Sequence, residues 1–152
     1  MFNQTRIHRG VCMEEDILFG ELTVEDMVKL QANIRNTKGE FFNEEIAAFL
    51  SLFLLQAVRN QKIKTLNEDL RRKVSLANCF VGGTTIVLLD NPFENIKIED
   101  REILAANIRK IAEKRKIAVI WATRDFSEAE DISNSIGNFI ILWKISNLRN
   151  AY

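Results

Sequence analysis

The sequence is poor in the residues from which many active sites are built. Its 152 residues include one histidine (His8), one proline (Pro92) and two cysteines (Cys12 and Cys79). A single histidine excludes a histidine-based metal cluster and a Ser-His-Asp triad. The two cysteines are too few and too far apart in sequence to indicate a disulfide framework or a metal site. Because both lie among apolar residues, we expect them to be buried free thiols.

The chain also lacks an excess of charge of either sign. Lysine plus arginine and aspartate plus glutamate both number 21, so the formal net charge is zero. Nucleic-acid-binding domains usually carry a basic excess or a basic face, and we therefore expect no nucleic-acid partner. Two short basic runs, residues 71–73 and 114–116, are predicted to be solvated helix faces or ends.

No apolar segment is long enough to cross a membrane. The longest, residues 46–58, is interrupted by Ser51 and Gln56, and it is shorter than the roughly 20 residues that a span requires. The first residues do not resemble a signal peptide. We expect a helix from about Asn43 to Val58 that packs against protein on more than one side. The expected location is cytoplasmic, or peripheral at the cytosolic face of a membrane.

The second half of the chain has the pattern of alternating strands and helices. Apolar runs at residues 85–89 and 117–122 flank a stripe with helical spacing at 103–112. A short helix is predicted at 127–132, and another apolar run follows at 139–143. This order predicts a parallel sheet with right-handed crossovers. Continuous β-branched and aliphatic runs are typical of strands that are buried on both faces. The first half is predicted to be helical, with Thr23 as the N-cap of its first helix, and residues 6–12 could form a short strand.

Four segments, in this order, resemble the ATP-binding domain of ABC transporters, most closely that of the A subfamily associated with lipid export. They correspond to the Q-loop with its following helix, the signature motif, the Walker B strand and the H-loop. In this chain they occupy residues 10–25, 66–77, 80–92 and 122–130. Each alone is a weak signal, but four in register over about residues 10–145 indicate common ancestry.

The resemblance implies an α/β fold, namely a partial P-loop NTPase (ABC-type) parallel sheet with a helical subdomain. We expect the helical subdomain at about residues 20–81 and the α/β core at about 84–145. The Walker A pattern G-x-x-x-x-G-K-S/T does not occur in the sequence, so the Walker A strand is expected to be missing. Its absence leaves three outcomes: the sheet closes across the gap, another chain supplies a strand, or the fold is marginal.

The family's cofactors are ATP and Mg²⁺, and the missing loop is what holds the phosphates. Glu14 stands at the Q-loop glutamine position, where it is either a weak cofactor and metal ligand or a surface acid. The signature position holds Asn67, Glu68 and Asp69. Asn67 is predicted to cap the following helix, and the two acids suit its dipole. The same carboxylates would repel a phosphate by roughly 1–4 kcal/mol at a distance of about 4 Å.

At the Walker B and H-loop positions, one family residue is retained and two are replaced. Asp90 retains the Walker B aspartate and is the one plausible Mg²⁺ ligand, although it could equally be a strand-end acid. Asn91 replaces the catalytic glutamate, and an amide cannot accept a proton from the attacking water. Arg124 replaces the H-loop histidine, where it either contacts a phosphate or is structural. No catalytic residue is therefore expected.

Two functions from different classes remain open at this point. One is a remnant or pseudo ATP-binding domain of a lipid-type ABC transporter, with weak or absent nucleotide binding and no expected hydrolysis. The other is a non-catalytic interaction module that docks on the membrane domain of a transporter or on a second nucleotide-binding domain. A poorly folded pseudogene product is a third interpretation. The sequence identifies no transported substrate, and it leaves open whether this is a short protein or a fragment.

Overall fold

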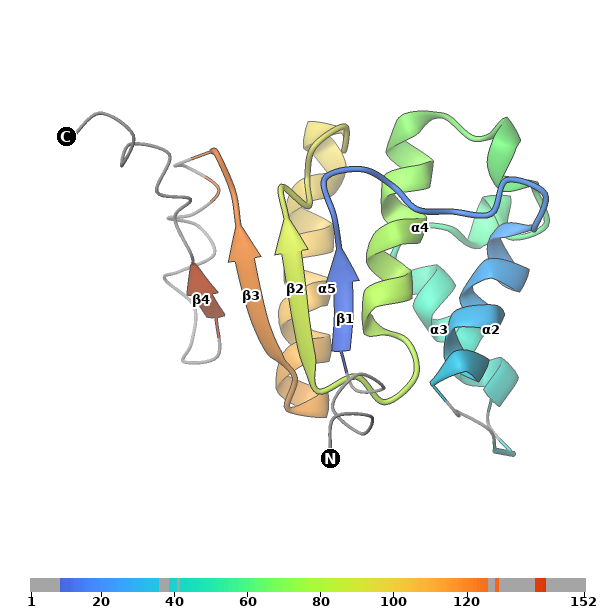
Figure 1. Cartoon of the computed structure of the whole chain (residues 1–152), viewed down its shortest axis with the longest axis horizontal. Coiled ribbons are helices and arrows are strands. Elements are labelled where there is room, and N and C mark those ends of the chain that lie inside the picture. Colours follow the sequence, from blue (N-terminus) through green and yellow to red (C-terminus); the bar gives the residue numbers. More distant parts are fainter. Residues whose placement is uncertain (1–8, 36–38, 41, 126–127, 129–138, 142–152) are drawn as a thin grey trace, which may run out of the picture.

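A four-stranded parallel sheet forms the centre of the computed structural model, which describes residues 9–35, 39–40, 42–125, 128 and 139–141. The strands lie side by side in sequence order (Figure 1). They are β1 (Arg9–Cys12), β2 (Ile86–Asp90), β3 (Ala118–Ala122) and β4 (Phe139–Ile141). The parallel sheet predicted from the second half of the chain is confirmed. The first half also contributes one strand, β1, at the sheet edge.

The sheet closes across the position of the missing Walker A strand. β4 pairs directly with β3, with Val119 opposite Phe139 and Trp121 opposite Ile141. The first of the three expected outcomes is therefore the one observed. Residues 142–143 of the predicted last strand and the helix predicted at 127–132 lie outside the described residues, apart from Glu128.

In the part of the chain that the structure describes, four α-helices pack on one side of the sheet and beyond its β1 edge (Figure 1). They are α2 (Val24–Ile34), α3 (Phe42–Leu52), α4 (Glu68–Phe80) and α5 (Ile98–Arg115), with short 3₁₀ turns at Gln56–Val58 and Ile63–Thr65. α5 connects β2 to β3 and packs behind them, whereas α4 lies beside β1. The predicted cap of α2 is confirmed, because the Asp26 amide donates to Thr23 Oγ1 at 3.1 Å.

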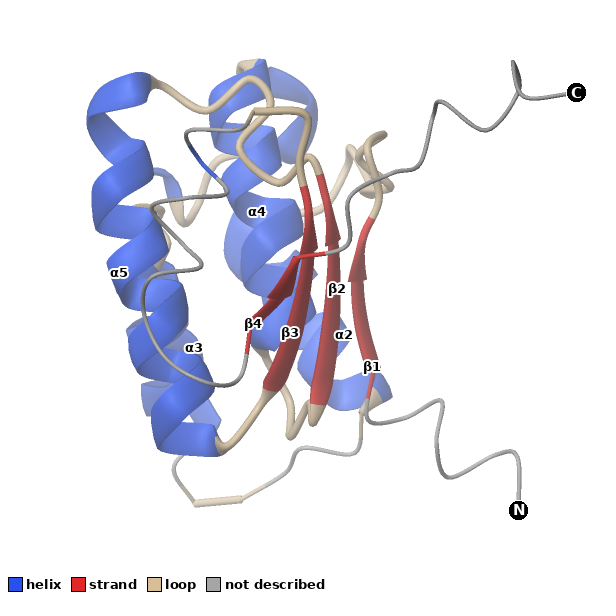
Figure 2. Ribbon diagram, turned by 90° about the vertical axis from the view of Figure 1, so that its left-hand side faces the viewer, coloured by secondary structure: helices blue, strands red, loops and turns tan. Residues whose placement is uncertain are grey.

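The prediction that the central strands are buried on both faces was wrong. Val87, Leu89 and Trp121 point toward the helices and are at most 2% exposed. Residues of the opposite face are half-buried or open, and Ile86 is 40% exposed. Figure 2 shows the described helices gathered on one side of the sheet. The apolar runs do form strands, but in the described part of the chain no helix covers the second face of the sheet.

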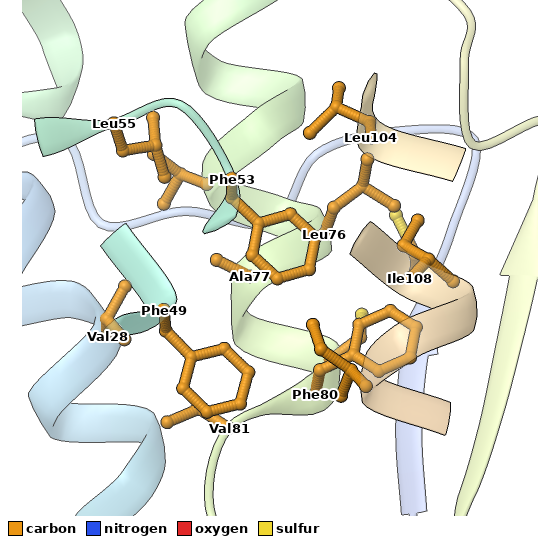
Figure 3. Close-up of a cluster of buried hydrophobic side chains, with 14 of the residues drawn as sticks. Val28, Phe49, Phe53, Leu55, Leu76, Ala77, Phe80, Val81, Leu104 and Ile108 are labelled. Carbon is orange, nitrogen blue, oxygen red and sulfur yellow. The ribbon is translucent and has the colours of Figure 1, made fainter. Parts of the chain in front are cut away.

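The main core lies between α3, α4 and α5 (Figure 3). Phe53 stacks on Phe49 and on Phe80, with ring centroids 6.3 and 5.8 Å away. The predicted helix from Asn43 to Val58 was wrong at its end, because α3 stops at Leu52. Leu54 adopts a left-handed conformation (φ 59°), and the Leu55 amide donates back to Leu50 O at 2.7 Å. This turn directs both Phe53 and Leu55 into the core, which a continuous helix would not do.

Other sequence expectations have mixed outcomes. Both cysteines are buried free thiols, as predicted. The division at residues 81–84 into a helical subdomain and an α/β core stays a prediction, since one continuous core cluster joins the two parts. Among the described helices, none is long and apolar enough to cross a membrane.

Candidate functional site

Three of the four family-like segments meet where the strands end, at the carboxyl edge of the sheet. Glu14, Asp90 and Arg124 each follow or end a strand, and β1, β2 and β3 are parallel. The carboxyl ends of parallel strands lie at the same edge, where open α/β sheets usually bind ligands. The structure thus brings the Q-loop, Walker B and H-loop positions together.

The two substituted loop positions are paired with each other. Arg124 Nη2 lies 2.5 Å from Glu14 Oε1, and both side chains are partly exposed. The Glu14 carboxylate is therefore engaged by an arginine rather than left open to a metal ion. Similarly, the Arg124 guanidinium is neutralised by a carboxylate, which reduces its capacity to attract phosphate.

Asn91 has a structural partner on each side. Its amide N–H donates to Ala122 O at 2.8 Å, and its side-chain Oδ1 accepts from the Arg124 backbone N–H at 3.1 Å. Its backbone is left-handed (φ 44°), a conformation that asparagine tolerates better than most residues. The position of the family's catalytic base therefore holds a residue that joins the ends of β2 and β3.

Asp90 ends β2 and is half-buried. Its backbone carbonyl accepts from Arg72 Nη2 at 2.7 Å. Among the described residues, none forms a hydrogen bond or ion pair with its carboxylate. Glu14, Asn91 and Arg124 each have a side-chain partner at this edge, whereas the Asp90 carboxylate has none among the described residues.

Arg72 joins the loops at this edge through hydrogen bonds. The prediction that it belongs to a solvated basic run was wrong. It is 1% exposed. Its guanidinium donates six hydrogen bonds within 3.3 Å: to the carbonyls of Met13, Glu14, Asp90, Asn91 and Pro92, and to Asp16 Oδ1. A signal was present in the sequence, since Arg72 lies four residues before Leu76 and eight before Phe80, on the buried stripe of α4.

The polar side chains at the signature position have partners within this chain. The cap by Asn67 was expected, whereas the contacts of Asp69 were not. Asn67 Oδ1 accepts from the Leu70 amide at 2.9 Å and caps α4. Asp69 is buried and bonds Lys73 Nζ at 2.7 Å and the Lys97 amide at 3.0 Å. The expectation that both acids would repel a phosphate was therefore wrong for Asp69, whose charge is neutralised. Glu68 remains exposed.

Lys73 is the second buried member of the basic run. Its ammonium lies 2.7 Å from Asp69 Oδ2 and 2.6 Å from Asp100 Oδ2. Burial disfavours the charged ammonium, but the hydrogen bonds that it donates to Asp100 and Asp69 outweigh burial and raise the lysine pKa. By contrast, residues 114–116 form an exposed helix end, as predicted, where Arg115 pairs with Glu45 at 2.8 Å.

A cavity of about 190 Å³ opens beside Arg124. Asn91, Arg101, Asp125 and Glu128 contribute polar atoms to its lining. Burial raises the pKa of the Glu128 carboxyl, although Trp121 Nε1 donates to it at 2.6 Å. The volume is below the roughly 300–1,000 Å³ of typical small-molecule pockets.

These residues do not fit Mg²⁺ and ATP as the family holds them. Within the described ranges, no group of three or more histidine, cysteine, aspartate or glutamate side chains is placed to hold a metal ion. The Asp90 carboxylate is a single donor, and Glu14 and Asn91 already have partners in Arg124. The sequence also supplies no phosphate-binding loop. We derive no catalytic step from this site.

Curated proteins related to this chain are ABC transporters. The sequence is 31% identical over 139 residues to the glucosylceramide transporter ABCA12 of Mus musculus, covering 88% of this chain. It is 29% identical over 130 residues to ABC transporter A family member 11 of Dictyostelium discoideum, covering 84% of this chain. This chain is a relative of A-subfamily ABC transporters. No protein-family model matches the sequence.

Solved structures show the same fold. An ABC transporter ATP-binding protein from Pyrococcus furiosus superposes with a TM-score of 0.70 at 22% identity, covering 82% of this chain and 61% of that protein. An ATP-binding subunit of an ABC transporter superposes with a TM-score of 0.75 at 18% identity, covering 84% and 52%. The chain therefore has a partial ABC-type P-loop NTPase fold, as the resemblance implied.

The match covers only a small part of the relatives. The chain spans 5% of the length of mouse ABCA12 and 15% of the Dictyostelium protein. The relationship thus concerns the ATP-binding region of the ABC transporters. What the complete transporters do comes to this chain only as a proposal.

Proposed function

We propose that this chain is a non-hydrolysing pseudo ATP-binding domain of an A-subfamily, lipid-type ABC transporter, with weak or absent nucleotide binding. The observation that carries the proposal is the mutual pairing of the substituted positions. Glu14 bonds Arg124, and Asn91 bonds the Arg124 backbone, at the edge where the family holds nucleotide. Side chains that satisfy one another in this manner lose little when no nucleotide is present.

The proposed loss of hydrolysis follows from the chemistry of Asn91. A neutral amide has no basic lone pair for a water proton, and removal of a general base typically costs roughly 10²- to 10⁴-fold in rate. The missing phosphate loop removes the amides and the lysine that hold the β- and γ-phosphates. ATP and Mg²⁺ are the cofactors of the relatives, and Asp90 is the residue proposed to retain contact with them.

Titration of the chain with a fluorescent ATP analogue and Mg²⁺ tests this proposal. We expect no saturable binding at sub-millimolar concentrations and no phosphate release above the background of buffer. Sub-millimolar affinity that is lost in Asp90→Ala would contradict the proposal. Glu94→Ala is the matched control, because Glu94 is an exposed acid at the rim of the same edge.

A second function, docking on the membrane domain of an ABC transporter, is favoured by an apolar segment after β1. Met13, Ile17 and Phe19 are 52%, 80% and 60% exposed. Large apolar side chains gathered on one segment are typical of protein or membrane contacts. Such docking would place the chain at the cytosolic face of a membrane without a span of its own.

This second function predicts binding to membranes that contain an A-subfamily transporter and not to vesicles of the same lipids alone. Ile17→Glu should weaken co-sedimentation with those membranes. Ile98→Glu is the control, since Ile98 is also 80% exposed but lies at the start of α5. Equal effects of the two substitutions, or equal binding to protein-free vesicles, would exclude a specific docking role for this segment.

A further inference from the structure

Two cysteines that are distant in sequence meet inside the protein. Cys12 ends β1 and Cys79 lies in the last turn of α4, and their exposed fractions are 3% and 2%. Both side chains line one cavity. The Cys12 thiol and burial raise the pKa of the Cys79 thiol, and Cys79 Sγ donates to the carbonyl oxygen of Ser75 at 3.2 Å. The two thiols are therefore neighbours at one buried site.

The close approach of β1 and α4 holds the two sulfurs together. A Cβ atom at Gly10 would lie 2.0 Å from the carbonyl oxygen of Cys79, so only glycine fits there. Arg35, at the end of α2, bridges the same junction. Its Nη1 donates to Asn78 O and to Val81 O at 2.6 Å each, and its Nη2 donates to Arg9 O of β1 at 3.4 Å. The junction is thus built from backbone contacts and does not depend on the thiols themselves.

A cavity of about 230 Å³ gives small molecules access to the pair. Cys12 and Cys79 both contribute to its lining, as do Ser75 and Asn78. Ser75 Oγ and Asn78 Oδ1 are buried and have no hydrogen-bond partner among the described residues. Unsatisfied buried polar atoms cost free energy, so they favour occupancy by a small polar molecule. The volume exceeds the roughly 30 Å³ share of one water.

A hydroperoxide has the size and the polarity that this cavity accepts. Its O–H group can donate to Asn78 Oδ1 or to Ser75 Oγ, and its oxygens can accept from the serine hydroxyl. The Cys79 thiol donates to Ser75 O within its own helix, and its pKa is raised by the Cys12 thiol and by burial. By contrast, the Cys79 thiol lowers the pKa of the Cys12 thiol, which favours its thiolate. Cys12 is therefore the residue placed to attack, and Cys79 is the residue placed to complete the bond.

We propose that Cys12 and Cys79 form a dithiol modification site that a small hydroperoxide converts into an intramolecular disulfide. The Cys12 sulfur attacks the terminal peroxide oxygen, the O–O bond breaks, and the leaving oxygen takes the thiol proton to form water or an alcohol. The resulting sulfenic acid is attacked by the Cys79 sulfur, the S–O bond breaks, and a second water leaves. The two thiols are oxidised by two electrons, and the peroxide is reduced by two.

The disulfide would fasten the segment after β1 to α4. Cys12 directly precedes Met13 and Glu14, whose carbonyl groups are already held by Arg72 of α4. A covalent link at this point shortens the free chain of the unfolded state and so raises stability. This inference does not depend on nucleotide binding, and its test is independent of the ATP titration.

The test exposes the reduced, folded 152-residue chain to hydrogen peroxide and then alkylates the remaining thiols in denaturant. Mass spectrometry should show the loss of both alkylated thiols, a mass lower by two hydrogens than the reduced chain, and a peptide that links Cys12 to Cys79. Dithiothreitol should restore both thiols. The oxidised chain should also melt at a higher temperature than the reduced chain.

Two single variants assign the roles. In Cys79→Ser, dimedone should trap a sulfenic acid on Cys12, whereas in Cys12→Ser the Cys79 thiol should survive the same peroxide treatment. Three results would overturn the proposal: both thiols surviving in the folded wild-type chain but not in the denatured chain, sulfinic acid on Cys12 beside a free Cys79, or a disulfide between two chains.

Discussion

Glu14 and Arg124, which are 110 positions apart in the sequence, form an ion pair with 2.5 Å between Oε1 and Nη2. The pair joins the loop after β1 to the loop after β3. Both side chains are partly exposed, at 38% and 64%, so solvent screens their attraction. The contact thus connects two loops at the strand ends without being a major source of stability.

A double-mutant cycle with Glu14→Gln and Arg124→Gln should give a coupling free energy of about 0.2–1 kcal/mol. The reason is the high effective dielectric around an exposed pair. Urea unfolding of the wild type, both single variants and the double variant measures it. A coupling that persists unchanged in 1 M salt would contradict an exposed ionic contact, since the Debye length there is only about 3 Å.

Arg72→Ala should destabilise the fold by about 3–5 kcal/mol, as is typical when one partner of a buried charged network is removed. The substitution leaves six acceptor contacts without a donor. Arg72→Lys should lose most of the same free energy, because one ammonium cannot reach all the acceptors on the two segments, residues 13–16 and 90–92. Urea unfolding is the measurement. Arg71→Ala, at the half-buried neighbour, is the control and should cost less than about 1 kcal/mol.

The contrast between Asn67 and Arg72 shows what could be predicted from sequence. The Asn67 and Thr23 caps have partners three residues away, so local pattern reveals them. The parallel arrangement of β2, β3 and β4 was predictable for a similar reason, since each of these strands carries its own apolar run, whereas β1 (RGVC) does not. Arg72 takes its acceptors from the chain around residues 13–16 and 90–92, and no local pattern records such distant partners. The contact of Asp69 with the Lys97 amide was hidden in the same manner, because the two residues are 28 positions apart.

Errors about burial had a different origin. The apolar run at β2 predicted that helices cover both faces of the sheet. An apolar sequence alone does not tell on how many faces helices pack. The turn at Leu54 was missed because residues 46–58 remain apolar through it, and the left-handed conformation is imposed by core packing. In both cases the error came from packing contacts between distant parts of the chain, which a local sequence pattern does not contain.

Gly10→Ala should destabilise the protein by about 3 kcal/mol, at the upper end of the usual cost of overpacking. The added Cβ would lie 2.0 Å from Cys79 O, which is a backbone atom that cannot turn aside. Gly39→Ala is the matched control, because a Cβ there meets nothing within 4 Å. Thermal and urea unfolding of the two variants measure the difference. Similar stability of both variants would show that β1 and α4 can separate without cost.

The stabilisation provided by Lys73 should disappear in alkali. Its pKa is raised because the hydrogen bonds that its ammonium donates to Asp100 and Asp69 outweigh burial. For a group whose folded pKa is raised, the contribution is complete below the unfolded lysine pKa of about 10.4 and is lost as the pH rises through the folded value. The stability difference between wild type and Lys73→Met should therefore shrink as the pH is raised above that point. Lys110→Met, at an exposed position of α5, should show no such trend.

Restoring the family's glutamate at position 91 should not restore catalysis and should destabilise the protein. Asn91 occupies a left-handed conformation, which costs most other residues roughly 1–2 kcal/mol. Asn91→Glu would also lose the acceptor for the Arg124 backbone N–H. Asn91→Gly separates these two effects, because glycine tolerates the conformation but offers no acceptor. We expect the unfolding free energy to fall most in Asn91→Glu and least in Asn91→Gly, with no phosphate release from either. ATP hydrolysis by Asn91→Glu would mean that the missing base alone, rather than the missing phosphate loop and the Glu14–Arg124 pair, accounts for inactivity.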